Sequence, residues 1–175
     1  MLEYIAQGLG IIGFICAILA FQSKKNSGLF MFQAMGCFSF FLQFLLLGVY
    51  SAALLNISCF IRGILFRKSD RKLWKLIVVD ALMIASVTSS IVFFTVGLLQ
   101  VSLSLMTGIS LITGTYVMWL GSGKHIRYIH LFLVSPVWLI HNFINFSLGG
   151  ILCEVFNMTS AIVSFIRFGK DGFEK

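Results

Sequence analysis

Residues 138–168 read WLIHNFINFSLGGILCEVFNMTSAIVSFIRF, and this stretch decides how the chain folds. Two apolar helices are predicted on either side of a turn at Ser147, Gly149 and Gly150. Several polar residues lie inside these helices, within about three helical turns of that turn. Inside a membrane such groups must face one another or a wet cavity, because hydrocarbon offers them no partner. They are His141, Asn142, Asn145, Glu154 and Asn157.

The composition is typical of a protein that crosses a membrane several times. Of 175 residues, 59% are hydrophobic and only 11% are charged, and the mean hydropathy is +1.00. A spanning helix takes about 20 residues, so seven spans use about 140 and leave only short loops. The first residues lack the basic region of a cleavable signal peptide. We therefore expect a retained first helix and no extramembrane domain.

Positive charge is confined to alternate loops. Lys or Arg residues follow the first, third, fifth and seventh predicted spans, and the other loops and the N-terminus hold none. Positively charged loops stay in the cytoplasm, so the N-terminus is predicted outside and the C-terminus inside. A six-span arrangement would divide the basic loops between the two faces. The seven predicted spans are 5–21, 28–48, 50–66, 74–95, 99–120, 126–146 and 149–168.

The two halves of the chain resemble each other weakly. A shift of 98 residues lays Gly10 on Gly108 and Gln43 on His141 without a gap. Two bundles of three helices joined by one linker helix would have the same orientation in the membrane, which is a parallel repeat. We therefore predict an all-α membrane protein of three plus one plus three helices, with bundles at 1–72 and 99–175 and a linker at 73–98.

Several short blocks resemble one family along nearly the whole chain. The chain is similar to the bacterial YgjV family of inner-membrane proteins, and this resemblance implies a location in the bacterial inner (cytoplasmic) membrane. More distantly, the predicted arrangement resembles the SWEET and Pro-Gln-loop transporters, although the Pro-Gln pair is missing and the only proline is Pro136. The blocks are AQGLG at 6–10, LGVY at 47–50 with Asn56 and Arg62, Trp138-x-x-His141-Asn142, Ser147-x-Gly149-Gly150, Glu154, Asn157 and IRF at 166–168.

The polar residues of four predicted spans fall at similar depth. Counted from the outer loops, they lie roughly 8 to 12 Å into a hydrocarbon core about 30 Å thick. They converge only if both bundles face a common cavity. Interhelical hydrogen bonds that merely tie the helices together are the alternative. The predicted substrate-binding residues are Gln43, Asn56, His141, Asn145, Glu154 and Asn157.

Charged residues suggest two further roles. A glutamate beside a histidine can take up and release a proton, so Glu154 and His141 are candidates for proton coupling. Arg62 and Arg167 are predicted to anchor the inner interface through lipid phosphates, with a gate or an anion ligand as the alternative. The four cysteines lie in apolar helices without a Cys-x-x-Cys pair, and packing explains them better than metal binding or disulfides.

These features favour a small transporter, either a facilitator or a proton-coupled carrier, for a compact polar metabolite. The alternative is a non-transporting receptor or assembly protein that binds a lipid headgroup, a peptide end or a partner helix. The KDEL receptor, which is similar in architecture, binds a peptide end without transporting it. We expect no enzyme activity, because no catalytic motif and no long loop is present. We also expect no cofactor, no metal and no nucleic-acid partner, and leave a homo-oligomer open.

Overall fold

The computed structural model describes residues 2–23, 26–68, 70, 72–94, 97–120 and 123–168. Its regular secondary structure over these residues is entirely helical, as predicted, and forms seven helical segments. The sixth segment is continuous from residue 123 to 144 and contains a π-helical turn that the sequence did not predict. The helices are α1 Leu2–Gln22, α2 Asn26–Leu46, α3 Tyr50–Phe66, α4 Leu73–Phe93, α5 Leu98–Leu120, α6 Gly123–Ile129, η1 His130–Val134, α7 Ser135–Ile144 and α8 Leu148–Phe168.

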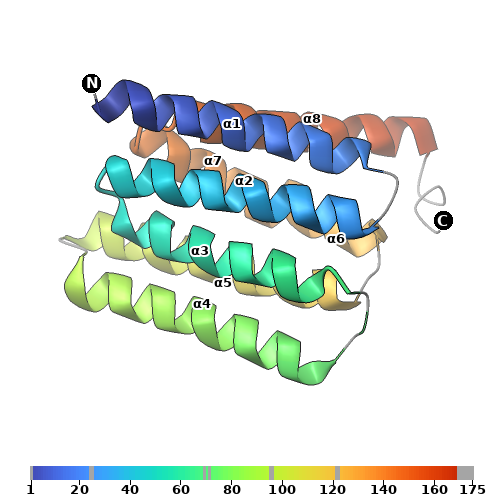
Figure 1. Cartoon of the computed structure of the whole chain (residues 1–175), viewed down its shortest axis with the longest axis horizontal. Coiled ribbons are helices and arrows are strands. Elements are labelled where there is room, and N and C mark those ends of the chain that lie inside the picture. The colour runs from blue at the N-terminus through green and yellow to red at the C-terminus, as the bar shows by residue number, and fades with distance from the viewer. Residues whose placement is uncertain are drawn as a thin grey trace.

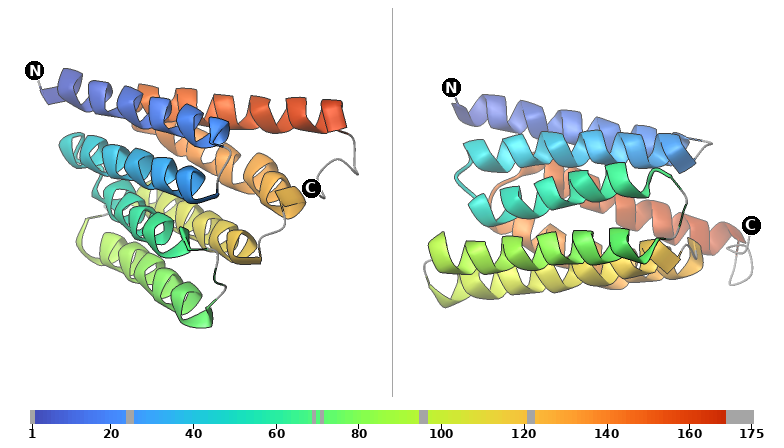
Figure 2. Two further views of the ribbon diagram at one scale, coloured as in Figure 1. Left: turned by 45° about the vertical axis from the view of Figure 1, so that its right-hand side comes forward. Right: turned by 60° about the horizontal axis from the view of Figure 1, so that its bottom comes forward.

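The seven segments run up and down as an antiparallel bundle of two layers. Figure 1 shows α1, α2, α3 and α4 in one layer, with α8, α7 and α5 behind them, and Figure 2 shows the same layers from two other directions. Each segment packs against the next one in the chain. In addition, α8 packs on α1 and α5 packs on α3, so the third helix of each half contacts the first helix of the other half.

Two turns close the same end of the bundle with the same hydrogen-bond pattern. After α2, Val49 N–H donates to the carbonyl of Phe44 (2.9 Å), and Gly48 has a φ of +74°. After α7, Ser147 N–H donates to Asn142 (3.0 Å), and Phe146 has a φ of +52°. Both are Schellman turns, which end a helix with a residue in the left-handed region. We call this end of the bundle the turn end.

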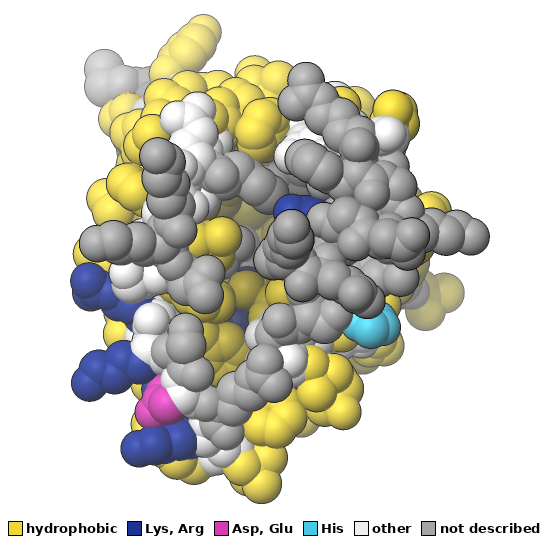
Figure 3. Space-filling view, turned by 90° about the vertical axis from the view of Figure 1, so that its right-hand side faces the viewer, with side chains coloured by type: hydrophobic (Ala, Val, Ile, Leu, Met, Phe, Trp, Pro, Cys, Tyr) yellow, Lys and Arg dark blue, Asp and Glu magenta, His cyan; other side chains and the backbone are white. Residues whose placement is uncertain are grey.

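The opposite end carries the basic residues and is called the basic end here. Lys75 of α4 is buried there, donates to the carbonyl of Leu65 in α3 (2.8 Å) and pairs with Asp70. The Asp70 carboxylate also lies 3.6 Å from Lys72. These contacts fix the connection between α3 and α4. Figure 3 views this end and shows Lys and Arg side chains gathered along one side of it.

Most helices expose apolar surface outward, as expected for a bundle surrounded by lipid. The segments Leu2–Ala20, Ser27–Leu46, Leu73–Phe93 and Leu98–Leu120 are long and apolar enough to cross a bilayer, and Tyr50–Phe66 and Leu148–Val163 are shorter apolar helices. In the first three, only 22% to 28% of the residues are buried within the protein, against 56% in the fourth. The outer faces of α1, α2 and α4 therefore require lipid, while α5 lies deeper in the bundle.

Candidate functional site

Gln43 of α2 is fully buried at the turn end and belongs to an amide network. Its Nε2 donates to Oε1 of Gln7 in α1 (3.3 Å), and its Oε1 accepts from the hydroxyl of Ser147 (3.2 Å). Gln7 Nε2 also donates to the carbonyl of Phe146 (2.8 Å), while Gln7 Oε1 accepts from the N–H of Leu148 (3.1 Å). The network ties α1 and α2 to the turn between α7 and α8.

Three glycines allow the helices to approach closely around this network. A Cβ on Gly10 would lie 2.5 Å from the Gln43 side chain, and one on Gly150 would lie 2.6 Å from Asn142. A Cβ on Gly149 would collide with the backbone of Gly10. Small residues at such positions let helix backbones pack against one another in membranes. The turn end is consequently closed between α1 and α8.

One face of α7 carries a stripe of buried polar side chains with unpaired atoms. Ser135, Trp138, His141 and Asn142 are 0%, 7%, 1% and 1% exposed. Their spacing of three or four residues puts them along one side of the helix. Each has a buried polar atom without a hydrogen-bond partner in the described part of the chain: Oγ, Nε1, Nδ1 and Oδ1, respectively. Buried polar atoms are normally paired, so the stripe offers unused bonding capacity to a water or a ligand.

Aromatic rings pack around the middle of this stripe. The ring of Phe44 in α2 lies 5.8 Å from the ring of His141 and 6.3 Å from that of Trp138. Trp138 and His141 are themselves 5.3 Å apart. These distances between ring centroids are those of ordinary aromatic contacts. The rings hold the imidazole and the indole in place at the interface between α2 and α7.

The acid and amide of α8 pair with each other. Asn157 Nδ2 donates to Glu154 Oε2 (3.3 Å) and contacts Cys153 Sγ (3.7 Å). The hydroxyl of Ser135 in α7 lies beside the Glu154 carboxyl group. Asn157 Oδ1 is buried and unpaired among the described residues. Ser135, at the N-terminal end of the α7 stripe, thus lies beside the polar residues of α8.

Not all of the predicted substrate-binding residues converge. Asn56 is buried, but its Nδ2 donates to the carbonyl of Ala52 within its own helix (2.9 Å). Asn145 is partly buried and donates to the carbonyl of His141 (2.8 Å), with a 3.4 Å contact to the imidazole. Among the described residues, no hydrogen bond or ion pair joins His141 to Glu154. The structure therefore brings Gln43 and His141 to the turn end and places Glu154 with Asn157 deeper along α8.

Arg62, which is predicted to anchor the inner interface, lies about one turn from the end of α3. It is only 8% exposed, and Nη1 donates to the hydroxyl of Thr115 in α5 (3.0 Å). The guanidinium thus lies between helices of the bundle near the basic end. The side chain of Arg167 lies outside the described part of the structure.

Sequence reasoning left five residues of these clusters out of the predicted site: Gln7, Ser135, Trp138, Asn142 and Ser147. Gln7 appeared only within a glycine-rich block, and Ser147 only as a turn residue. Asn142, not Asn145, is the amide that faces the interior, and the signal for it is the regular spacing from Ser135 and Trp138 along one helix face. That signal is visible in the sequence once α7 is known to begin near Ser135.

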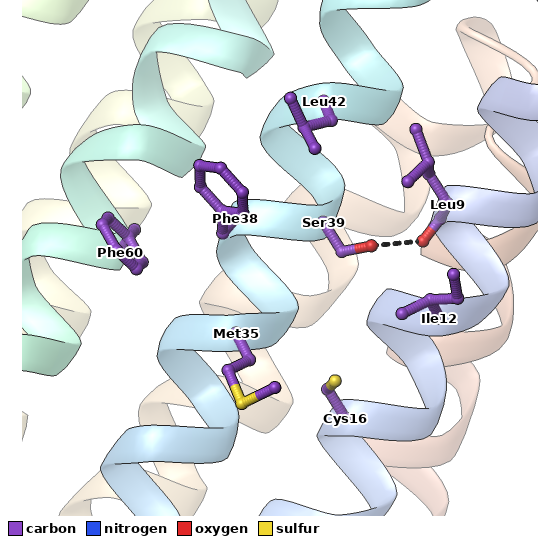
Figure 4. Close-up of a pocket in the computed structure, with 8 residues that line it drawn as sticks. All are labelled: Leu9, Ile12, Cys16, Met35, Phe38, Ser39, Leu42 and Phe60. Atoms are coloured by element: carbon purple, nitrogen blue, oxygen red, sulfur yellow. Dashed lines mark hydrogen bonds between the residues drawn. The ribbon is translucent and has the colours of Figure 1, made fainter.

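A pocket of about 290 Å³ lies away from these polar residues, between α1, α2 and α3. Figure 4 shows its lining, in which the hydroxyl of Ser39 is already bonded to the carbonyl of Leu9 (2.6 Å). Met35 and Phe38, on its rim, belong to the exposed surface of α2. The pocket is therefore an apolar groove on the lipid-facing surface. Its lining residues are Leu9, Ile12, Cys16, Met35, Phe38, Ser39, Leu42 and Phe60.

An all-helical bundle with apolar outer faces, buried polar clusters inside and basic residues gathered at one end defines a multi-pass membrane protein. Its location is the bacterial inner membrane. Residues 4–172 match the Imp-YgjV family, described as bacterial inner membrane protein, and the chain belongs to this family. No curated protein and no solved structure matches the chain.

Proposed function

We propose that the protein is a small transporter that moves a compact polar metabolite across the inner membrane. The observation that carries the proposal is the α7 stripe, in which the neighbouring buried side chains of Trp138, His141 and Asn142 each keep a polar atom that is unpaired among the described residues. Structural hydrogen bonds between helices would use these atoms. A polar solute or the water that accompanies it supplies the missing partners.

The substrate path in this proposal runs between the two halves of the chain, 1–72 and 99–175, with 73–98 as the linker. The matching Schellman turns at Gly48 and Phe146, 98 residues apart, support a parallel repeat. The packing of α8 on α1 and of α3 on α5 supports the repeat as well, because in each case the third helix of one half contacts the first helix of the other. The N-terminus lies outside and the C-terminus in the cytoplasm, because the basic end then faces inward.

The turn end is the closed, outward-facing gate of this transporter. Gln7, Gln43 and Ser147 bond across it, and Gly10 and Gly149 bring α1 and α8 into backbone contact. Opening must break these contacts to expose His141 to the outside. Gln43, His141 and Asn142 then form the outer part of the path, while Glu154 and Asn157 line its deeper part. We assign Asn56 and Asn145 to the support of these residues.

A transport measurement with one matched pair of variants tests the proposal. Purified protein is screened for metabolites that raise its melting temperature, and uptake of each hit into vesicles is then measured. Ser135→Ala removes a buried hydroxyl that lies beside the Glu154 carboxyl group, so it should reduce uptake while changing stability little. Ser102→Ala, which removes an exposed hydroxyl bonded to its own helix, should change neither. If no metabolite stabilises the protein and none accumulates, the proposal fails.

The alternative function is that of a non-transporting receptor or assembly protein, and the apolar groove of α1, α2 and α3 favours it. A groove without free polar groups suits a lipid chain or a partner helix. In that case Phe38→Ala, in the groove, should impair function while Ser135→Ala has no effect. We further propose that the protein is not an enzyme and that its partners are lipid and a small polar ligand, without nucleic acid.

A further inference from the structure

A second polar cluster lies near the basic end, where four helices meet around Arg62. The guanidinium has five N–H donors, and in the described part of the chain one hydrogen bond, to Thr115, engages it. The Thr115 hydroxyl contacts Met83 Sδ of α4 in turn (3.5 Å), which places α4 at the same spot. Arg62 is 8% exposed, and Thr115 is the one hydrogen-bond partner of its guanidinium among the described residues.

A carboxyl group lies in the same part of the bundle, because Asp80 is three residues before Met83 on α4, and Met83 contacts the Thr115 hydroxyl that is bonded to Arg62. Asp80 of α4 is near enough for its charge to interact with that of Arg62, yet no ion pair within 4.0 Å joins the two among the described residues. Asp80 Oδ1 is buried and has no hydrogen-bond partner. Asp80 also shares a helix face with the buried residues Leu76 and Met83, so it borders the interior of the bundle.

A histidine and the thiols of Cys37 and Cys59 also lie in the neighbourhood of Arg62. His130 begins the π-helical turn η1, and its charge interaction with Arg62 puts it in the same region. π-helical turns occur frequently at functional sites. Arg62, Asp80, Thr115 and His130 all lie about 6 to 11 Å from the ends of their helices at the basic end, counted at 1.5 Å per residue. Four elements therefore place polar groups at one level.

We infer that Arg62 and Asp80 form a binding site for a zwitterion of amino-acid type, entered from the basic end. A carboxylate of the ligand accepts hydrogen bonds from the guanidinium fork, which suits it better than a single ammonium would. An ammonium of the ligand donates to Asp80 Oδ1. A ligand with both charges pairs the buried Arg62 and the half-buried Asp80, whereas a simple anion leaves Asp80 unpaired.

This inference rests on the proposed function, since it names the substrate class of the transporter, but equilibrium binding tests it separately from transport. Protein in nanodiscs of neutral lipid is titrated with the twenty proteinogenic amino acids, one at a time. Propionate, ethylamine and inorganic phosphate serve as probes with charge of one sign. At least one amino acid should bind, and each of the three probes should bind at least tenfold more weakly.

Two variants and a control connect that binding to the site. Arg62→Gln and Asp80→Asn should each weaken binding of the amino acid at least tenfold. Arg67→Gln, at an exposed arginine just beyond α3, should leave it unchanged. If Arg62→Gln does not fold, Arg62→Lys keeps the charge and should still weaken binding, because the bidentate fork is lost.

Three results would overturn the inference. One is phosphate or propionate binding as tightly as any amino acid, and vesicles with and without phosphatidylglycerol then show whether a lipid phosphate is the anion. The second is an amino acid that binds equally well to the Asp80→Asn variant. The third is no amino acid binding at all, and uptake of another polar metabolite would then leave the proposed function standing. Amino-acid binding without any uptake would reject the function but keep the site.

Discussion

The side chain of Gln7 in α1 forms two hydrogen bonds with the backbone of the turn at Phe146. Its Nε2 donates to the Phe146 carbonyl at 2.8 Å, and its Oε1 accepts from the next-but-one N–H, that of Leu148, at 3.1 Å. The turn residue itself has a φ of +52°, which is unfavourable for a phenylalanine. The amide of α1 therefore stabilises a turn that the local sequence does not favour.

Replacing Gln7 with Ala should loosen the turn end. The variant loses both bonds to the turn and the contact with Gln43, which together contribute about 1 to 2 kcal/mol to the free energy of unfolding. If the turn end is an outer gate, a cysteine introduced at Asn142 in a version without native cysteines should become more reactive toward an impermeant thiol reagent in the Gln7→Ala background. Denaturant titration and labelling rates measure the two effects.

Gln22→Ala is the matched control for this experiment. Gln22 is an exposed amide at the other end of α1, so its loss should alter neither stability nor labelling. Equal labelling of the cysteine at position 142 with and without Gln7 would show that this amide does not hold a gate.

Adding one methyl group at Gly149 should disrupt the packing of α1 on α8. Its Cβ would collide with the Gly10 backbone, which cannot move aside as a flexible side chain can. We expect Gly149→Ala to destabilise the protein by about 1 to 3 kcal/mol, the usual cost of overpacking. Gly8→Ala is the control, because a Cβ there meets nothing within 4 Å and alanine favours a helix. Equal unfolding curves for both variants would contradict this account of the contact.

The number and nature of the helices could be predicted because they follow from composition and length. Apolar runs of about 20 residues that are separated by glycines or charged residues have few possible structures in lipid other than spanning helices. Gly48 marks the end of α2 in the sequence, since glycine accepts a positive φ at little cost. At the matching turn the positive φ falls on Phe146, whereas Gly149 and Gly150, which were predicted in the turn, lie within α8. The predicted end of the sixth span falls slightly beyond the observed end of α7.

The details of the site could be predicted less well, because they depend on which face of each helix turns inward. Depth along a helix follows from counting residues, and this count put Gln43, His141 and Glu154 at similar depth. The rotation of α7 about its own axis decides whether Asn142 or Asn145 faces the interior of the bundle. The π-helical turn in η1 changes this rotation for all residues of the helix that follow it. A pattern of apolar residues on all sides of a membrane helix does not reveal this rotation.

Acid should weaken the connection between α3 and α4. The hydrogen bond from Lys75 holds the pKa of Asp70 below its usual range, with help from the charge of Lys72. A carboxyl group with a lower pKa in the folded protein stabilises the fold above its usual pKa, about 4, and loses this effect as the pH falls through its lower folded value. Asp70→Asn should therefore be less stable than the parent at pH 7, and the difference should vanish at strongly acidic pH.

Melting temperatures of the two proteins across the pH range measure this effect. Lys72→Gln removes the weaker of the two partners, so it should reduce the pH-dependent difference only in part. A constant gap between Asp70→Asn and the parent at every pH would mean that the ionisation of Asp70 does not contribute.

Glu154 provides the test of proton coupling. Its carboxyl group accepts a hydrogen bond from Asn157 and has no cationic partner among the described residues, so in apolar surroundings it is the kind of group that exchanges a proton during transport. Glu154→Gln keeps the shape and the acceptor oxygen but removes the exchangeable charge. We expect the variant to exchange substrate down its gradient at near-normal rate and to lose accumulation driven by a pH gradient.

A variant of His141 tests whether proton coupling needs the Glu154–His141 pair that was predicted from the sequence or needs Glu154 alone. Because no contact joins His141 to Glu154 among the described residues, His141→Gln should lower substrate affinity without abolishing pH-driven accumulation. Both variants are compared with the parent in vesicles with and without an imposed pH gradient, using the metabolite found by the stability screen. Undiminished uphill uptake by Glu154→Gln would exclude this carboxyl group as the coupling site. Loss of uphill uptake in both variants would instead mean that the two groups titrate as one unit, as the sequence suggested.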